Sequence, residues 1–125
     1  MNVPEDLRYT KDHEWVRVED DIAVVGITDY AQGELGDIVY IEPPAIGDET
    51  TQFESCGSIE AVKAVSDIFA PVSGEVIDVN EALDANPQLI NQNAFADGWI
   101  MKIKFADPAE MDNLLTAEDY KELLG

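Results

Sequence analysis

Apolar side chains fall into short runs separated by turn residues, a pattern that predicts β-strands rather than long helices. Between residues 15 and 19, Trp15, Arg17 and Glu19 alternate with two valines, which is the period of two of a half-buried strand. Asp20 and Asp21 follow as a tight turn before an apolar run, so the first two strands should pair as a hairpin. The predicted strands cover residues 15–19, 22–27, 37–42, 53–61, 65–71, 75–80 and 99–105.

One short helix interrupts this series. Thr28 is a suitable N-cap, and Gly36 can adopt the backbone conformation that ends a helix, so a helix is predicted near residues 29–35. Many short strands with few helices favour a β-sandwich or barrel over a sheet built from βαβ units. A length of 125 residues is close to the commonest domain size, so one mainly β domain over residues 1–125 is expected.

Helical periodicity returns at the end of the chain, over about residues 107–124. Pro108 suits the first turn of one helix, and Thr116 with Asp119 three residues later resembles the capping box that begins another. The apolar positions that these C-terminal helices should bury are Met111, Leu114 and Leu115 in the first and Tyr120, Leu123 and Leu124 in the second.

The chain is strongly acidic, with 27 acidic and seven basic residues and a formal net charge of −20. Such a charge repels nucleic-acid phosphates and anionic lipids, so neither nucleic acid nor a membrane is an expected partner. No apolar run has the length that crosses a bilayer, and the first residues lack the basic and apolar stretches of a signal peptide. We therefore expect a cytoplasmic prokaryotic protein, with a matured organellar protein as the less favoured alternative.

A single cysteine and a single histidine argue against a disulfide, a metal cluster or a catalytic triad. Candidate chemistry therefore depends on Lys63, which lies between the strands predicted over residues 53–61 and 65–71. A tight turn within a hairpin at about residues 59–67 should hold its amine in solvent. An ordinary surface lysine is one interpretation, and a lysine presented for attachment of a covalent acyl cofactor is the other. The strands on both sides favour the second.

The segment EAVKAVSD, residues 60–67, resembles the lipoyl attachment site of the glycine cleavage system H-protein family. This segment alone would indicate only the broader class of biotinyl and lipoyl carriers. Further stretches resemble the family in the same order over nearly the whole chain, which makes the resemblance specific. They are residues 9–16, 25–32, 35–39, 70–76, 80–83, 87–91 and 98–103.

The resemblance implies a β-barrel sandwich hybrid, like a lipoyl domain, that carries lipoate in amide linkage on Lys63. The protein would be a carrier in glycine catabolism and one-carbon metabolism rather than an enzyme, since the cofactor does the chemistry. Its arm would take an aminomethyl group from a glycine decarboxylase that uses pyridoxal phosphate to an aminomethyltransferase that uses tetrahydrofolate. A dihydrolipoyl dehydrogenase would then reoxidise the dithiol. Lipoylating enzymes are further implied partners, and a monomer is expected.

Three carboxylates acquire roles from the resemblance. Glu14 and Asp67 would otherwise be solvated side chains; here one or both are expected to receive the protonated aminomethyl group, because a cation that leaves water needs an opposite charge. Glu60 is expected to help lipoylating enzymes to recognise the hairpin, although turn chemistry would also explain it. The sequence departs from the family pattern at Ala61, where serine is usual, and at Phe53, near a usual glycine turn.

Three alternative functions remain open. A biotin carrier would use the same lysine, although such sites typically place methionines where this chain has Val62 and Ala64. A protein that relays lipoate to other enzymes would have the same attachment site. A β-domain that binds partners through its acidic surface would leave Lys63 unmodified.

Overall fold

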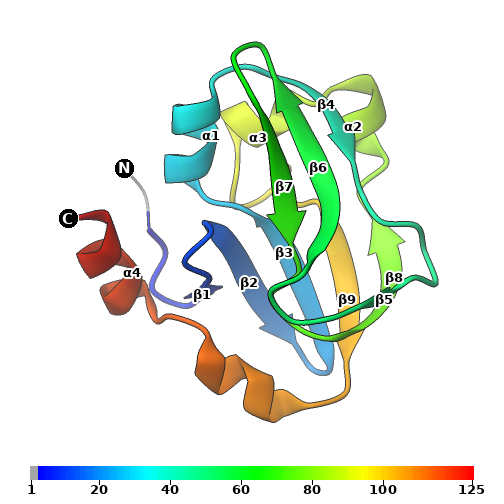
Figure 1. The fold of residues 1–125 in the computed structure, drawn as a ribbon, viewed down its shortest axis with the longest axis vertical. Helices are drawn as coiled ribbons and strands as arrows, with labels where there is room; N and C mark the ends of the chain where they lie inside the picture. The colour runs from blue at the N-terminus through cyan, green and yellow to red at the C-terminus, as the bar shows by residue number, and fades with distance from the viewer. Residues whose placement is uncertain (1–2) are drawn as a thin grey trace.

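In the computed structural model, which describes residues 3–125, nine strands form two antiparallel sheets (Figure 1). The larger sheet has the order β1-β2-β3-β9-β8-β5, and the smaller has the order β4-β6-β7. The expected mainly β fold class is therefore confirmed. The strands are β1 (Arg8–Tyr9), β2 (Glu14–Glu19), β3 (Ile22–Ile27), β4 (Ile38–Glu42), β5 (Glu49–Thr50), β6 (Ser55–Ala61), β7 (Val65–Phe69), β8 (Gly74–Val79) and β9 (Met101–Phe105).

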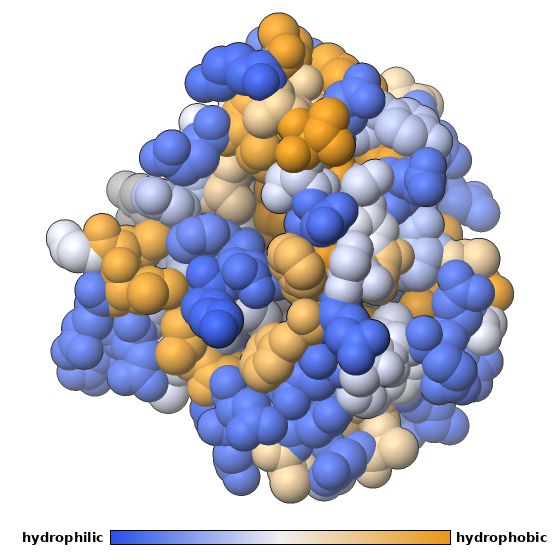
Figure 2. Space-filling model, viewed as in Figure 1, coloured by the Kyte–Doolittle hydropathy of each residue, from blue (hydrophilic) through white to orange (hydrophobic). Residues whose placement is uncertain are grey.

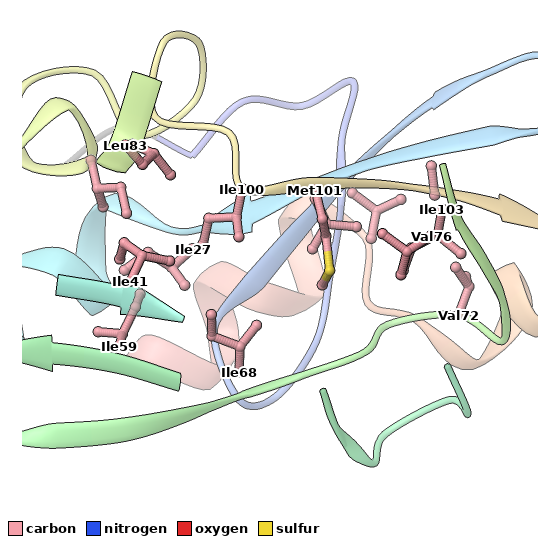
Figure 3. Close-up of a cluster of buried hydrophobic side chains, with 14 of the residues drawn as sticks. Ile27, Ile41, Ile59, Ile68, Val72, Val76, Leu83, Ile100, Met101 and Ile103 are labelled. Atoms are coloured by element: carbon pink, nitrogen blue, oxygen red, sulfur yellow. The ribbon is translucent and has the colours of Figure 1, made fainter. Parts of the chain in front are cut away.

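The main core fills the space between the two sheets, because each sheet has one apolar face to bury. The smaller sheet contributes Ile41, Ile59 and Ile68, which Figure 3 shows facing apolar side chains of the larger sheet such as Ile27 of β3 and Met101 of β9. A second apolar cluster lies beyond the larger sheet, where Trp15 and Tyr120 are fully buried. The two clusters explain why strand β2 has buried side chains on both faces near Trp15.

The short helix predicted from its caps is present as α1 (Asp29–Leu35). Thr28 Oγ1 accepts a hydrogen bond from Ala31 N–H at 3.2 Å, and Gly36 has a positive φ of 81° just beyond the last turn. Two further single-turn helices, α2 (Ala82–Ala85) and α3 (Leu89–Gln92), lie between β8 and β9. They each bury one apolar side chain.

The C-terminal segment contains the 3₁₀ helix η1 (Pro108–Asn113) and the α-helix α4 (Ala117–Leu124). Thr116 caps α4 as predicted, since its Oγ1 accepts from Asp119 N–H at 3.1 Å. The predicted apolar face of the first helix is only partly correct. Leu114 is buried in the main core and Met111 packs against it, but the helix ends before Leu114, and Leu115 instead forms a β-bridge with Tyr9. The stripe predicted for the second is also incomplete, because Leu123 is 51% exposed.

The observed strand β6 is shorter than the strand predicted over residues 53–61, since it begins only at Ser55. Phe53 lies in the preceding turn with a positive φ of 66°, a backbone conformation that a strand cannot contain. The strand predicted over residues 65–71 likewise ends at Phe69. The strand predicted over residues 99–105 begins at Met101.

Each strand pair of the smaller sheet contains a shift of register. One shift lies between Ile38 and Tyr40 on β4, and the other lies between Ser55 and Gly57 on β6. At each shift a side chain from outside the sheet accepts a hydrogen bond from a strand N–H. The acceptor is Asn91 Oδ1 for Ile38 N–H and Glu14 Oε2 for Phe69 N–H.

The visible surface is mostly hydrophilic, with apolar side chains gathered at the top of the view, over the turn between β6 and β7 (Figure 2). Val62 and Val65 at this turn are 72% and 68% exposed. Among residues 3–125, no helix has both the length and the apolar character needed to cross a bilayer.

Candidate functional site

Lys63 lies in the turn that joins β6 to β7, at one end of the molecule (Figure 1). Ala61 N–H donates to Ala64 O at 2.8 Å and closes this turn around Val62 and Lys63. The lysine side chain is exposed, and it forms no ion pair within residues 3–125. Its amine is therefore accessible to another enzyme.

The hairpin tip rests against the chain segment that joins α1 to β4. Val62 N–H donates to Asp37 O at 3.0 Å. The Lys63 side chain lies over Gly36, where an added Cβ would come within 3.1 Å of Lys63 Cε and 3.7 Å of Lys63 Nζ. A glycine at this position therefore makes room for the lysine stem as well as allowing the positive φ.

A surface cleft of about 300 Å³ begins beside this segment. Leu35, the residue before Gly36, lines the cleft together with Ala31 and Tyr30 of α1. The remaining lining residues are Asp12, His13, Glu34 and Ser66. The cleft thus combines apolar surface from one helix with two carboxylates, and it extends from the lysine hairpin to the loop before β2.

The hydroxyl of Tyr120 joins the two sides of the cleft. Tyr120 Oη lies 2.8 Å from His13 Nδ1 in the loop before β2 and 2.7 Å from Thr28 Oγ1, which caps α1. The His13 ring also packs against Tyr30, with ring centroids 4.8 Å apart. Burial lowers the pKa of His13, which favours the neutral ring at this position.

Glu14 is a buried carboxylate, with only 1% of its surface exposed. Thr10 Oγ1 donates to Glu14 Oε1 at 2.5 Å, and Phe69 N–H donates to Glu14 Oε2 at 3.3 Å. Burial raises the pKa of Glu14 to about 8, although both hydrogen bonds oppose the shift. Within residues 3–125 no basic side chain forms an ion pair with Glu14, so the ionised form of this carboxyl group lacks a counter-ion.

Glu60 and Asp67 lie on the exposed side of the smaller sheet. Glu60 is opposite Tyr40 on one side and Val65 on the other, and Asp67 is opposite Ser58. Both carboxylates are exposed, and neither lines the cleft beside α1. The structure therefore separates the two candidate cargo contacts: Glu14 is buried beneath β7, whereas Asp67 is exposed two residues before Phe69.

Three contributors to the site were missed from the sequence. Thr10 supplies the hydroxyl that binds Glu14, and Tyr120 supplies the hydroxyl that joins the walls of the cleft. The apolar wall formed by Ala31 and Leu35 was detectable, because residues four apart share one face of a helix. Within residues 3–125 no group of three or more metal-ligating side chains could hold a metal ion.

Known proteins are similar to this chain over almost its full length. The family model described as glycine cleavage H-protein matches residues 7–125. A protein of Halothermothrix orenii named glycine cleavage system H protein is 54% identical over 124 residues, which cover 99% of this chain and 97% of that relative. One of Staphylococcus carnosus with the same name is 50% identical over 125 residues, covering 100% of this chain and 99% of that relative.

A solved structure has the same fold. The crystal structure of a glycine cleavage system H protein from Mycobacterium marinum superposes with a TM-score of 0.89 at 35% sequence identity. The match covers 98% of this chain and 99% of that chain. The two sheets, the short helices and the turn that carries Lys63 thus belong to one shared architecture.

Proposed function

The chain belongs to the glycine cleavage H-protein family, and from this premise we propose that it carries a lipoyl group on Lys63 and moves an aminomethyl group between enzymes. The observation that supports this proposal most directly is the position of Lys63 at an exposed hairpin turn beside a cleft. Three of the other four lysines have side-chain partners: Lys104 and Lys121 pair with acids, and Lys102 lies over the Trp99 ring.

The residues around Lys63 fit a lipoyl group. Gly36 leaves the lysine stem room that a Cβ would fill, and Ala31 and Leu35 offer apolar surface in the adjoining cleft. Attachment forms an amide: the neutral Nζ attacks the carbonyl carbon of an activated lipoyl group, the bond to its leaving group breaks, and Nζ loses a proton. Acylation changes the formal net charge from −20 to −21. When bound, the cofactor supplies a redox-active disulfide whose reduced form carries the one-carbon unit.

The protein's own contribution to cargo transport is electrostatic. A protonated aminomethyl group would enter a cleft lined by Asp12 and Glu34. Glu14 is a buried carboxyl group whose raised pKa keeps it mostly protonated at neutral pH, and it is not among the residues that line this cleft. A cation close to it would stabilise its ionised form more strongly than the same cation would in water. Asp67 is the second proposed contact, on the exposed side of β7. Holding the cation in this way slows hydrolytic loss of the one-carbon unit.

The proposed partners follow from the carrier role. They are a glycine decarboxylase that uses pyridoxal phosphate, an aminomethyltransferase that uses tetrahydrofolate, a dihydrolipoyl dehydrogenase and lipoylating enzymes. We propose that Glu60, exposed three residues before Lys63, contributes to recognition by the lipoylating enzyme. The proposal also includes a monomeric protein in a prokaryotic cytoplasm.

The test is intact mass after incubation with a lipoate–protein ligase, lipoate and ATP. Wild-type protein should gain one lipoyl group, Lys63→Ala should gain none, and Lys11→Ala, another exposed lysine, should gain one. The lipoylated wild type should then support exchange between bicarbonate and the glycine carboxyl group when the decarboxylase is added. Absence of any adduct on wild type, or an adduct that persists in Lys63→Ala, would refute the assignment.

The same experiment distinguishes this function from the two alternatives, a biotin carrier and a protein that relays lipoate to other enzymes. A biotin carrier would gain a biotinyl mass with a biotin ligase, and that adduct would not respond to a thiol reductant. A protein that only relays lipoate would become lipoylated but would not support glycine carboxyl exchange.

A further inference from the structure

The turn that carries Lys63 has little support of its own. β7 is an edge strand of the smaller sheet, and Val62, Lys63, Ala64 and Val65 are all exposed. The turn is closed by the hydrogen bond from Ala61 N–H to Ala64 O. Within residues 3–125, it is joined to the rest of the molecule outside β6 and β7 by the hydrogen bond from Val62 N–H to Asp37 O and by the packing of Lys63 over Gly36. The orientation of the lysine therefore depends on how firmly residues 36–38 are held.

Asn91 of α3 holds residues 36–38 from the other side. Its Oδ1 accepts from Ile38 N–H at 2.9 Å, and its Nδ2 donates to Gly36 O at 2.8 Å. The same Nδ2 donates to Gln32 Oε1 of α1 at 2.9 Å. One amide thus binds the backbone on both sides of Asp37, the residue whose carbonyl receives the hydrogen bond from the hairpin.

Water cannot easily replace this side chain. Ile38 is fully buried, and its N–H lies where the register of β4 against β6 shifts. A buried N–H that loses its acceptor is costly, so the segment would rearrange rather than remain in place. The neighbouring Ile90 is also fully buried in the main core, which fixes α3 and hence the position of Asn91.

We propose that Asn91 is a positioning residue for Lys63: it transmits the rigidity of the core, through residues 36–38, to the turn that presents the lysine. The part of this proposal that concerns acylation rests on the proposed lipoyl-carrier function. Without Asn91, the turn samples more orientations, and a lipoylating enzyme must order it on binding. That ordering raises the KM for the protein substrate and leaves kcat unchanged, because the amine itself is not altered.

The test compares Asn91→Ala and Asn91→Asp with Asn80→Ala. Asn91→Asp keeps an acceptor for Ile38 N–H but loses the donor to Gly36 O. It is included so that the test can still be made if the Asn91→Ala protein does not fold. Asn80 is a matched control, because its side chain also forms three hydrogen bonds. It donates to the Asp97 and Trp99 carbonyls and accepts from Ala82 N–H, and none of these bonds reaches residues 36–38. The Asn91 variants and Asn80→Ala should show a similar loss of thermal stability.

Two readouts distinguish positioning from general destabilisation. The first is amide hydrogen exchange at Val62 in the unmodified protein, which should become about tenfold faster in both Asn91 variants and stay unchanged in Asn80→Ala. The second is the KM of a lipoate–protein ligase for the unmodified protein, which should rise about fivefold in the Asn91 variants alone. Both are measured well below the unfolding temperature.

Each result decides the proposal. Faster exchange at Val62 with a higher KM in the Asn91 variants supports it. Equal exchange in the Asn91 and Asn80 variants overturns it, and so does faster exchange without a change in KM. If wild type itself is not lipoylated, the carrier function fails, and the exchange rate still shows whether Asn91 orders the turn.

Discussion

Replacing Glu14 by glutamine is expected to remove a large part of the pH dependence of stability. Glu14 is buried, and burial raises the pKa of its carboxyl group from 4.5 to about 8. Between these two values the folded protein holds a proton that the unfolded chain releases. The stabilisation from this proton is complete below about pH 4.5 and is lost as the pH rises toward 8.

The size of the effect follows from the shift. One pKa unit corresponds to about 1.4 kcal/mol, so the free energy of unfolding should fall by up to about 1.4 kcal/mol per pH unit. A shift from 4.5 to about 8 gives a total of roughly 5 kcal/mol. Domains of this size are stable by only about 5–15 kcal/mol, so the loss is a large fraction of the whole.

Urea denaturation of the unmodified protein at four values between about pH 5 and pH 8 measures this slope. Glutamine resembles protonated glutamate in shape but cannot ionise, so wild type should lose stability relative to Glu14→Gln as the pH rises. Glu60→Gln is the matched control, because Glu60 is exposed on the same side of the molecule as the lysine hairpin. A pH dependence that appears equally in Glu60→Gln would not be specific to Glu14.

A constant difference between wild type and Glu14→Gln at all pH values would refute the reasoning, because it would show that the carboxyl group titrates at the same pH in the folded and unfolded states. The cargo proposal adds one more outcome. A protonated aminomethyl group beside Glu14 lowers the pKa of that carboxyl group, so the pH slope of the loaded protein should be smaller than that of the unmodified protein.

Three further changes test other parts of the site. Gly36→Ala and Gly47→Ala both place alanine at a positive φ, of 81° and 97°, and should each cost about 1–2 kcal/mol by urea denaturation. Only Gly36→Ala should also alter the acylation rate of Lys63, because a Cβ at Gly47 has no neighbour within 4 Å. Tyr120→Phe removes a hydroxyl with two buried or half-buried partners and should lower the free energy of unfolding by about 1–2 kcal/mol, measured in the same way. Burial raises the pKa of the Cys56 thiol to about 12, so a thiol reagent at pH 8 should label the native protein far more slowly than the protein in urea.

Local signals in the sequence were sufficient for α1, for most of the longer strands and for the turn that exposes the lysine, but not for β1, β5, α2 or α3. The helix α1 follows from a capping threonine and a terminal glycine, and both act as expected. Phe53 could not be placed correctly, because its aromatic side chain favours a strand while the turn before β6 holds it at a positive φ. A preference for strand was overridden there by tertiary structure.

The environment of the site could not be predicted, because it depends on contacts between distant residues. Glu14 is polar and precedes a predicted strand, so its sequence context suggests exposure; it is buried because Phe69, 55 residues later, lies against it. Asn91 lies in a stretch of turn residues, and its partners Gly36 and Ile38 are 55 and 53 residues away. A local sequence pattern contains no information about contacts between residues so far apart in the chain.

On the proposed function, the two register shifts of the smaller sheet assign attachment and transport to two side chains of different chemistry. At the shift near Lys63, the supporting side chain is the amide of Asn91, which is neutral at every physiological pH, so this support should not change with the charge of a group attached to the lysine. At the other shift the supporting side chain is the carboxyl group of Glu14, whose pKa burial raises to about 8, so that it ionises only as the pH approaches this value. Only this second contact can respond to a cation. On the proposed function, substitutions at the two positions should therefore have different effects. Glu14→Gln should shorten the lifetime of the loaded aminomethyl group and leave the KM for lipoylation unchanged. Asn91→Asp should raise that KM. A Glu14→Gln protein that retains its cargo as long as wild type would show that Glu14 has only a structural role.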